Sequence, residues 1–244
     1  MKIVYLVSRQ WSADILKKIA DDKNIIIKKK IVFTTKKIFL KNVNLKKNEI
    51  IKINEKNLSL YFSKIKIFKP NLIFAFGWSG FLSKKIRKIA PCLVLHPSKL
   101  PLFRGGSPIQ NQLINGIQKS AVTILFASDK IDSGDILYQK KINFNGYLED
   151  IQGEIVKEGI KGAKFILDQN NKRKLISFKQ NHKIATTFKR RKPSMSKISI
   201  EDFEKHEAEY FYNLVRGLQK PYPECYIKCK NNTKLYLQKV KFKR

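Results

Sequence analysis

His96 and Asp132 are the two residues of this sequence whose types and surroundings best fit acid–base chemistry. His96 follows the apolar run CLVL and opens a segment rich in proline and glycine, HPSKLPLFRGG at 96–106. An imidazole in such a rigid loop can transfer a proton or stabilise an oxyanion. Asp132 stands 36 residues further along, in the glycine-containing turn IDSGD at 131–135. A carboxylate beside a histidine orients the ring and stabilises its charged form.

Each of these residues also has a purely structural interpretation. A histidine can cap the end of a strand, and aspartate is common in turns because its side chain accepts hydrogen bonds from nearby backbone. Spacing alone does not show that the two side chains meet. The elements that carry them must decide whether they form one site.

The first hundred residues alternate between apolar strands and helices. Near-continuous apolar runs rich in β-branched residues are typical of strands covered on both faces of a parallel sheet. The predicted strands are 2–8, 25–33, 71–76 (ended by Gly77) and 92–95, the predicted helices are 12–22 (capped by Ser12) and 81–89, and residues 50–53 and 59–68 are ambiguous. This order predicts an α/β fold with a Rossmann-like, doubly wound, mostly parallel sheet and helices on both faces. Ligands of such sheets bind beyond the carboxyl ends of the strands, where His96 is expected.

The rest of the chain is predicted to complete this domain and to add a small C-terminal extension. Ser107-Pro108 is typical of a helix start, and two alternating runs after it resemble a strand pair. The predicted elements are a helix from 108 to about 115, strands at 121–127 and 135–143, a helix at 148–168, a last helix near 200–218 and a hairpin near 224–241. We therefore expect a catalytic domain over residues 1–180 and a helix/β-hairpin extension over 181–244.

The composition limits the classes of protein that fit. Hydrophobic residues make up 43% of the 244, enough for a packed core. No apolar run reaches the roughly 18 residues of a membrane span, and the N-terminal run is too short for a signal peptide. We expect a cytoplasmic protein without membrane contact. The three cysteines, Cys92, Cys225 and Cys229, fit neither a disulfide framework nor a zinc pattern and are expected to be structural.

The formal net charge of +32 has two interpretations. Such a charge is typical of proteins that bind nucleic acid. The lysines are spread along the whole chain, however, together with abundant isoleucine and asparagine, which is equally typical of a general compositional bias. In either case the charge attracts anionic substrates, including phosphates.

The segment from His96 to Leu137 resembles the signature of the folate-dependent formyltransferases, which include methionyl-tRNA, glycinamide ribonucleotide and sugar N-formyltransferases. The family pattern runs N-x-H-x-S-x-L-P, then R-G, P-I-Q, V-T-I and L-D-T-G-D, with a fixed spacing between histidine and aspartate. The matching residues are His96, Ser98, Leu100, Pro101, Arg104, Gly105, Pro108, Ile109, Gln110, Val122, Thr123, Ile124, Asp132, Gly134 and Asp135. The segments FKRRKPS at 188–194 and FYNLVRGLQKPYP at 211–223 are similar to the tail of the sugar-modifying branch.

The resemblance implies a reaction and two catalytic residues. A substrate amine attacks the formyl carbon of N10-formyltetrahydrofolate, with neither a metal nor a covalent protein intermediate. His96 is expected to donate to the developing oxyanion or to relay the proton, and Asp132 is expected to hold and charge the histidine. The family asparagine two residues before the histidine is Val94 here. Such an oxyanion donor is typically worth about 3–4 kcal/mol, so a loop N–H or a water must replace it, the activity is slow, or the protein binds without reacting.

The resemblance also suggests contacts to the two substrates, each weighed against a structural role. Ser98, Leu100 and Pro101 shape the formyl pocket or only stiffen the loop; Arg104 meets the folate tail or a substrate phosphate, or is solvated; Trp11 stacks on a ring or packs in the core; Gln110 contacts substrate or only lies on a helix face. The predicted residues are, for the cofactor, Gly77, Trp78, Ser98, Leu100, Pro101, Arg104 and Gly134 and, for the acceptor substrate, Arg9, Trp11 and Gln110.

The acceptor expected from the resemblance is the amino group of a nucleotide-linked amino sugar, for the biosynthesis of surface polysaccharide such as lipopolysaccharide O-antigen. Only about 60 residues follow the expected core, and the acceptor's diphosphate fits a basic protein. Methionyl-tRNA is the alternative acceptor, which the charge favours. A folate- or nucleotide-binding pseudoenzyme is the non-catalytic alternative. A homodimer is expected in each case.

Overall fold

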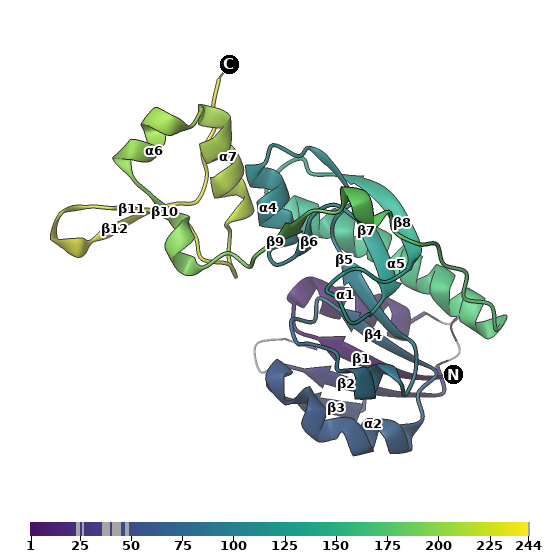
Figure 1. Cartoon of the computed structure of the whole chain (residues 1–244). Helices are drawn as coiled ribbons and strands as arrows, with labels where there is room; N and C mark the ends of the chain where they lie inside the picture. The colour runs from purple at the N-terminus through teal and green to yellow at the C-terminus, as the bar shows by residue number, and fades with distance from the viewer. Residues whose placement is uncertain (23–24, 26, 36–39, 41–44, 47–48, 244) are drawn as a thin grey trace.

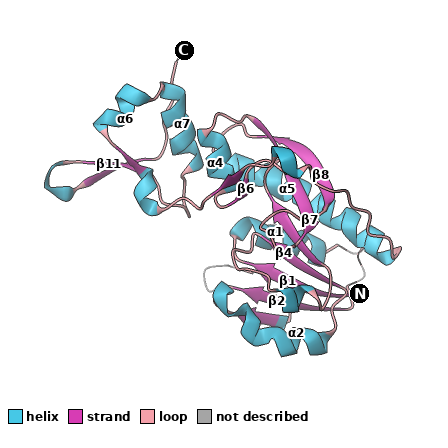
Figure 2. Ribbon diagram, viewed as in Figure 1, coloured by secondary structure: helices cyan, strands magenta, loops and turns pink. Residues whose placement is uncertain are grey.

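The computed structural model describes residues 1–22, 25, 27–35, 40, 45–46 and 49–243. Its centre is a seven-stranded sheet with the order β3-β2-β1-β4-β5-β7-β8 (Figures 1 and 2). The strands of this sheet are β1 (Lys2–Val7), β2 (Lys29–Thr34), β3 (Ile50–Lys52), β4 (Leu72–Phe76), β5 (Cys92–His96), β7 (Lys119–Phe126) and β8 (Ile136–Asn143). The first five in spatial order pair in parallel, whereas β7 and β8 are antiparallel to their neighbours. The predicted doubly wound, mostly parallel sheet is confirmed.

Helices cover both faces of this sheet. The helices of the chain are α1 (Gln10–Ala20), α2 (Phe62–Phe68), α3 (Lys84–Arg87), α4 (Pro108–Ile114), α5 (Leu148–Asn171), α6 (Ile200–Lys205) and α7 (Ala208–Gly217). Successive residues of a strand point to opposite faces, and because both faces are covered, β1 is buried from Ile3 to Val7. Tyr5 and Val7 pack with α1 and α5 on one face, while Val4 and Leu6 pack with α2 and α3 on the other.

Several predicted boundaries are corrected by the structure. Helix α1 begins at Gln10, so Ser12 is not its cap; the Ser12 hydroxyl donates to the Arg9 carbonyl from inside the first turn. The predicted strand 25–33 begins only at Lys29, and residues 23, 24 and 26 lie outside the described residues. The predicted helix 81–89 is reduced to α3, which Ser83 caps by accepting from the Ile86 N–H.

The C-terminal part of the chain forms an extension that projects from the α4 end of the domain (Figure 1). The predicted helix 200–218 is two helices, α6 and α7, because His206 takes an extended backbone conformation between them. The predicted hairpin is present as β11 (Cys225–Lys228) and β12 (Lys234–Leu237), joined by β10 (Lys197–Ile198) in a three-stranded sheet. The boundary at residue 180 stays a prediction.

A short segment before α6 packs against the loop that follows β5. Residues Thr187–Phe188 form β9, which pairs in parallel with β6 (Arg104–Gly105). The pairing is extended by hydrogen bonds from the Arg104 N–H to the Thr186 carbonyl and from the Gly106 N–H to the Phe188 carbonyl. The glycine- and proline-rich loop after β5 is thereby fixed by residues more than eighty positions further along the chain.

Burial shifts the pKa values of several side chains. All three cysteines are free thiols, and burial raises the pKa of both Cys92 and Cys225 to about 12. Burial alone would raise the pKa of Glu158 in α5, but hydrogen bonds from Lys161 and Tyr138 outweigh it, and the pKa lies below the ordinary value.

Within the described residues, no helix is long and apolar enough to cross a membrane.

Candidate active site

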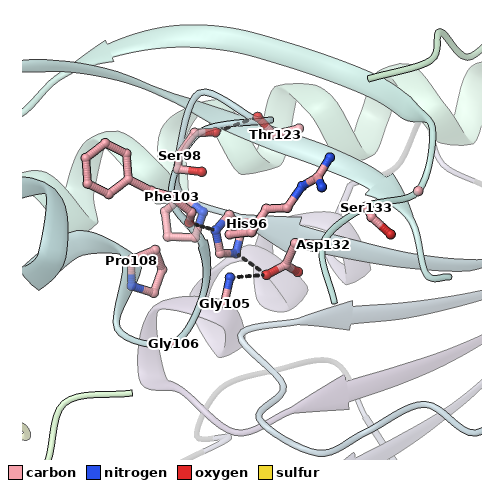
Figure 3. Close-up of polar contacts among 12 residues, drawn as sticks. His96, Ser98, Phe103, Gly105, Gly106, Pro108, Thr123, Asp132 and Ser133 are labelled. Carbon is pink, nitrogen blue, oxygen red and sulfur yellow. Dashed lines mark hydrogen bonds and ion pairs between the residues drawn. The ribbon is translucent and has the colours of Figure 1, made fainter. Parts of the chain in front are cut away.

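The imidazole of His96 lies at the carboxyl end of β5, the strand between β4 and β7. His96 is the last residue of the strand rather than the first residue after it, and it lies opposite Thr123 of β7. The side chain is largely buried, with 6% of its surface exposed. Its Nδ1 atom is 3.4 Å from Oδ2 of Asp132 (Figure 3). The two residues that spacing alone could not connect therefore meet in one site.

The carboxylate of Asp132 is held in place by backbone. Its Oδ2 atom accepts a hydrogen bond of 2.9 Å from the Gly105 N–H, in the loop that follows β5 (Figure 3). Asp132 itself has a left-handed φ of +51°, which aspartate adopts more readily than most residues. Gly134 lies so close to β7 that a Cβ atom on it would be 1.9 Å from the Phe126 carbonyl oxygen. Only glycine fits this close approach.

The second nitrogen of His96 also has a partner. Its Nε2 atom is 2.7 Å from the carbonyl oxygen of Phe103, which can only accept, so Nε2 carries a proton. A second proton on Nδ1 would then face the Asp132 carboxylate. The ring thus lies between two acceptors, the Phe103 carbonyl and the Asp132 carboxylate, which together fix its orientation.

The loop between His96 and Phe103 is fixed by its own polar contacts. The Ser98 hydroxyl donates to the Leu102 carbonyl at 2.8 Å, and the Thr123 hydroxyl donates to the Ser98 carbonyl at 2.6 Å. Leu100 is buried in a small apolar cluster, and its carbonyl accepts from the Gln139 amide at 3.0 Å. Ser98 and Leu100 therefore stiffen this loop; the contacts with a cofactor predicted for them and for Pro101 stay predictions.

Val94, in the position of the family asparagine, presents an apolar side chain beside this loop. It packs against the cluster formed by Leu100, Leu125 and Ile136. The backbone N–H groups of residues 98, 100 and 102–106 are already hydrogen-bonded within the protein. Among the other non-proline residues from 97 to 107, Lys99 and Ser107 have N–H groups without a hydrogen-bond partner within the described residues, so they are the candidates for a backbone donor that replaces the asparagine.

The carboxyl ends of β1 and β4 form a second part of the candidate site. Gly77 ends β4 with a φ of +61°, and its carbonyl accepts from the Ser8 hydroxyl at 2.6 Å. The Arg9 guanidinium donates to the Ser79 hydroxyl at 3.0 Å and lies 6.0 Å from the ring centroid of Tyr222, which belongs to the C-terminal extension. This edge of the sheet thus presents a cation beside an aromatic ring.

The two tryptophans of this edge have different surroundings. Trp11 is 7% exposed and packs in the main core, which favours the structural interpretation over contact with substrate. Trp78 is half-buried, and its indole N–H is buried without a hydrogen-bond partner among the described residues.

Arg104 and Gln110 are both buried and contact other parts of the chain. Arg104 is buried rather than solvated; it donates to Gln180 and lies 2.9 Å from Nδ1 of His182. Burial lowers the pKa of this guanidinium, and the charge of Asp132 acts in the opposite direction. Gln110 is buried, and its amide donates to the Gly217 carbonyl of α7, which favours a structural role.

Gln180, His182 and the β9 strand escape prediction from sequence because they lie in a polar segment without periodicity. The only available signal was the proximity of this segment to the family-like motif FKRRKPS. Among the described residues, no cluster of three or more His, Cys, Asp or Glu side chains could hold a metal ion.

Comparisons with known proteins identify the family to which this chain is similar. A family model described as formyl transferase matches residues 1–157. A methionyl-tRNA formyltransferase from Clostridioides difficile (strain 630) is 28% identical over 246 residues, covering 93% of this chain and 76% of the relative. The solved methionyl-tRNA formyltransferase from Clostridium thermocellum is 27% identical with a TM-score of 0.75, covering 100% of this chain and 94% of that one. A sugar N-formyltransferase from Shewanella sp FDAARGOS_354 has a TM-score of 0.76 at 15% identity, covering 100% and 99%.

Proposed function

Because the chain belongs to the formyl transferase family, whose enzymes use 10-formyltetrahydrofolate, we propose that it transfers the formyl group to the amine of a nucleotide-linked amino sugar. The observation that carries this proposal is the His96–Asp132 pair at the carboxyl end of β5. Ligands bind at this edge in doubly wound sheets.

The chemistry is an acyl transfer between two nitrogens. The acceptor nitrogen bonds to the formyl carbon, the bond from that carbon to N10 of the folate breaks, and the amine proton ends on N10. Negative charge develops on the formyl oxygen, and a donor aimed at that oxygen lowers the barrier. His96 supplies this donor through Nε2, whose present partner, the Phe103 carbonyl, gives way to the formyl oxygen.

Asp132 keeps His96 in the form that donates. Its negative charge, 3.4 Å from Nδ1, stabilises the cationic ring. Gly105 fixes the carboxylate through its N–H, and Gly134 allows the turn to pack against β7. The second donor, which replaces the asparagine of the family, is the backbone N–H of Lys99 or Ser107 or a bound water.

The residues at the carboxyl ends of β1 and β4 support a sugar nucleotide as the acceptor. The Arg9 guanidinium can bind a diphosphate, and the Tyr222 ring beside it can stack on a base or on a sugar face. The net charge of +32 attracts such an acceptor. The formylated sugar would serve surface polysaccharide synthesis, and the enzyme would act in the cytoplasm as a homodimer.

Methionyl-tRNA is the second candidate acceptor. The relatives from Clostridioides difficile and Clostridium thermocellum carry that name, at 28% and 27% identity. The two candidates differ in how strongly salt weakens binding, because many phosphate contacts produce a steep dependence on salt concentration.

The deciding experiment measures folate turnover with 10-formyltetrahydrofolate against a panel of nucleotide-linked amino sugars and against methionyl-tRNA. We expect turnover with a sugar nucleotide, and its loss in His96→Ala and Asp132→Ala with the fold intact. Turnover with methionyl-tRNA alone would overturn the proposed acceptor. Binding of folate without turnover of any acceptor would identify a pseudoenzyme.

A further inference from the structure

The side chain of Gln180 connects the two loops that form the His96–Asp132 site. It is 6% exposed and lies two residues after Phe178, which forms an antiparallel bridge with Ile136 at the start of β8. Its amide nitrogen donates to the carbonyl of Asp132 at 3.0 Å and to that of Gly134 at 2.7 Å. Its amide oxygen accepts from Nε and Nη2 of Arg104, at 3.2 and 2.6 Å. An amide has two donors and one oxygen with two lone pairs, so the group is fully used.

These contacts hold the Asp132 carboxylate from both sides. On one side, Gln180 binds the backbone of Asp132, which has a left-handed conformation. On the other, it binds the side chain of Arg104, and the next residue, Gly105, donates its N–H to the Asp132 carboxylate. Displacement of the Gln180 amide would free both loops at the point where they meet His96.

The contacts also explain why an amide suits this position. A buried guanidinium needs acceptors, and Arg104 is close enough to Asp132 for the carboxylate to affect its pKa. Gln180 supplies Arg104 with a neutral acceptor, so Asp132 need not pair with Arg104 and its carboxylate can remain beside His96. A glutamate here would accept from Arg104 but would repel the two carbonyls that now accept from the amide nitrogen.

We propose that Gln180 is a positioning residue for the reaction: its amide fixes the Asp132 turn against the Arg104 loop so that the carboxylate stays beside His96. This role rests on the proposed function, in which Asp132 charges His96. Gln180 itself touches neither reacting group.

The kinetic test compares Gln180→Met and Gln180→Glu with Gln169→Met. Gln169 is a matched control. It lies near the end of α5, and its amide oxygen accepts from the N–H of Ile176, in the segment that leads to Gln180, at 3.2 Å. We expect kcat to fall about 10- to 100-fold in both Gln180 variants, as misplacement of a catalytic group by about 1 Å does. The KM for folate should change less than about threefold, and Gln169→Met should keep wild-type kinetics.

A double-mutant cycle separates positioning from a general structural effect. In an Asp132→Asn background, Gln180→Met should lower kcat by less than about threefold further, because the carboxylate it positions is already gone. An equal loss in both backgrounds would overturn the proposal, and so would wild-type kcat in Gln180→Glu.

A spectroscopic test does not depend on turnover. The chain has three histidines, so ring ¹⁵N signals of labelled protein are few. The His96 signals should change in Gln180→Met and not in Gln169→Met, with His206 of the extension as an internal reference. Unchanged His96 signals in folded Gln180→Met would overturn the role of Gln180. Absence of turnover in the wild type would instead contradict the proposed function.

Discussion

Replacement of Asp132 by asparagine tests the electrostatic core of the proposed mechanism. The substitution keeps the shape of the side chain and leaves an amide oxygen to accept from the Gly105 N–H, but it removes the negative charge that faces Nδ1 of His96. The expected effect is therefore on the reaction rather than on folding.

The size of this effect follows from the distance. Two unit charges 3.4 Å apart attract by about 1 kcal/mol in water and by about 5 kcal/mol at the effective dielectric constant of a protein site. Each 1.36 kcal/mol is about tenfold in rate, so kcat should fall between about tenfold and several thousandfold. The side chains of His96 and Asp132 are only 6% and 12% exposed, which places the expected loss near the upper end.

The assay is steady-state turnover of 10-formyltetrahydrofolate at saturating acceptor, with the melting temperature measured in parallel. Asp129→Asn is the control, because Asp129 lies in the same loop, is exposed, and pairs with Arg87. We expect the control to keep wild-type kcat, because Asp129 pairs with Arg87 and not with His96. A folded Asp132→Asn enzyme with less than a threefold loss of kcat would refute the electrostatic argument.

Three further predictions concern packing, pH and thiol reactivity. Gly134→Ala should lower kcat about 100-fold or destabilise the protein, because its Cβ must move about 1 Å away from the Phe126 carbonyl; Gly153→Ala in α5, where a Cβ meets open space, should raise the free energy of unfolding by up to about 1 kcal/mol in denaturant titrations. The lowered pKa of Glu158 contributes stability that is present above the ordinary glutamate pKa of about 4.3 and is lost as pH falls through the folded value; melting temperatures from pH 7 to 3 should therefore fall more steeply in the wild type than in Glu158→Gln, and parallel curves would contradict this. A thiol reagent at neutral pH should react rapidly with the exposed Cys229 alone, and with the two buried cysteines only after unfolding; rapid reaction of a second thiol would contradict the burial argument.

The fold was predictable from sequence where burial dictates the pattern. The apolar runs at 71–76 and 92–95 could only be strands covered on both faces, and His96 followed from the second of them. Helix boundaries were less predictable, because a serine that bonds back to a preceding carbonyl is indistinguishable in sequence from a cap. Ser12 is such a residue.

The proposed catalytic pair was predictable only in part. Sequence motifs identified His96 and Asp132, but their contact depends on the pairing of β5 with β7 and on the Gly105 N–H. The role of Gln180 has no local signal at all, because side-chain amides that bridge distant loops follow no periodicity. Buried polar networks of this kind are visible only once the chain is folded.

The pairing of β6 with β9 also sets an order for assembly during synthesis. Arg104 and Gly105 precede their partners, Thr187 and Phe188, by 83 residues. A ribosome that adds 5–20 residues per second needs roughly 4 to 17 s to cover that interval. The nascent chain can form β1, β4 and β5 within that time, but the loop beside His96 has no strand to pair with until residue 188 has been made. The loop beside His96 is therefore among the last parts of the domain to close, so a ribosome that stalls before residue 188 leaves this loop without its partner strand.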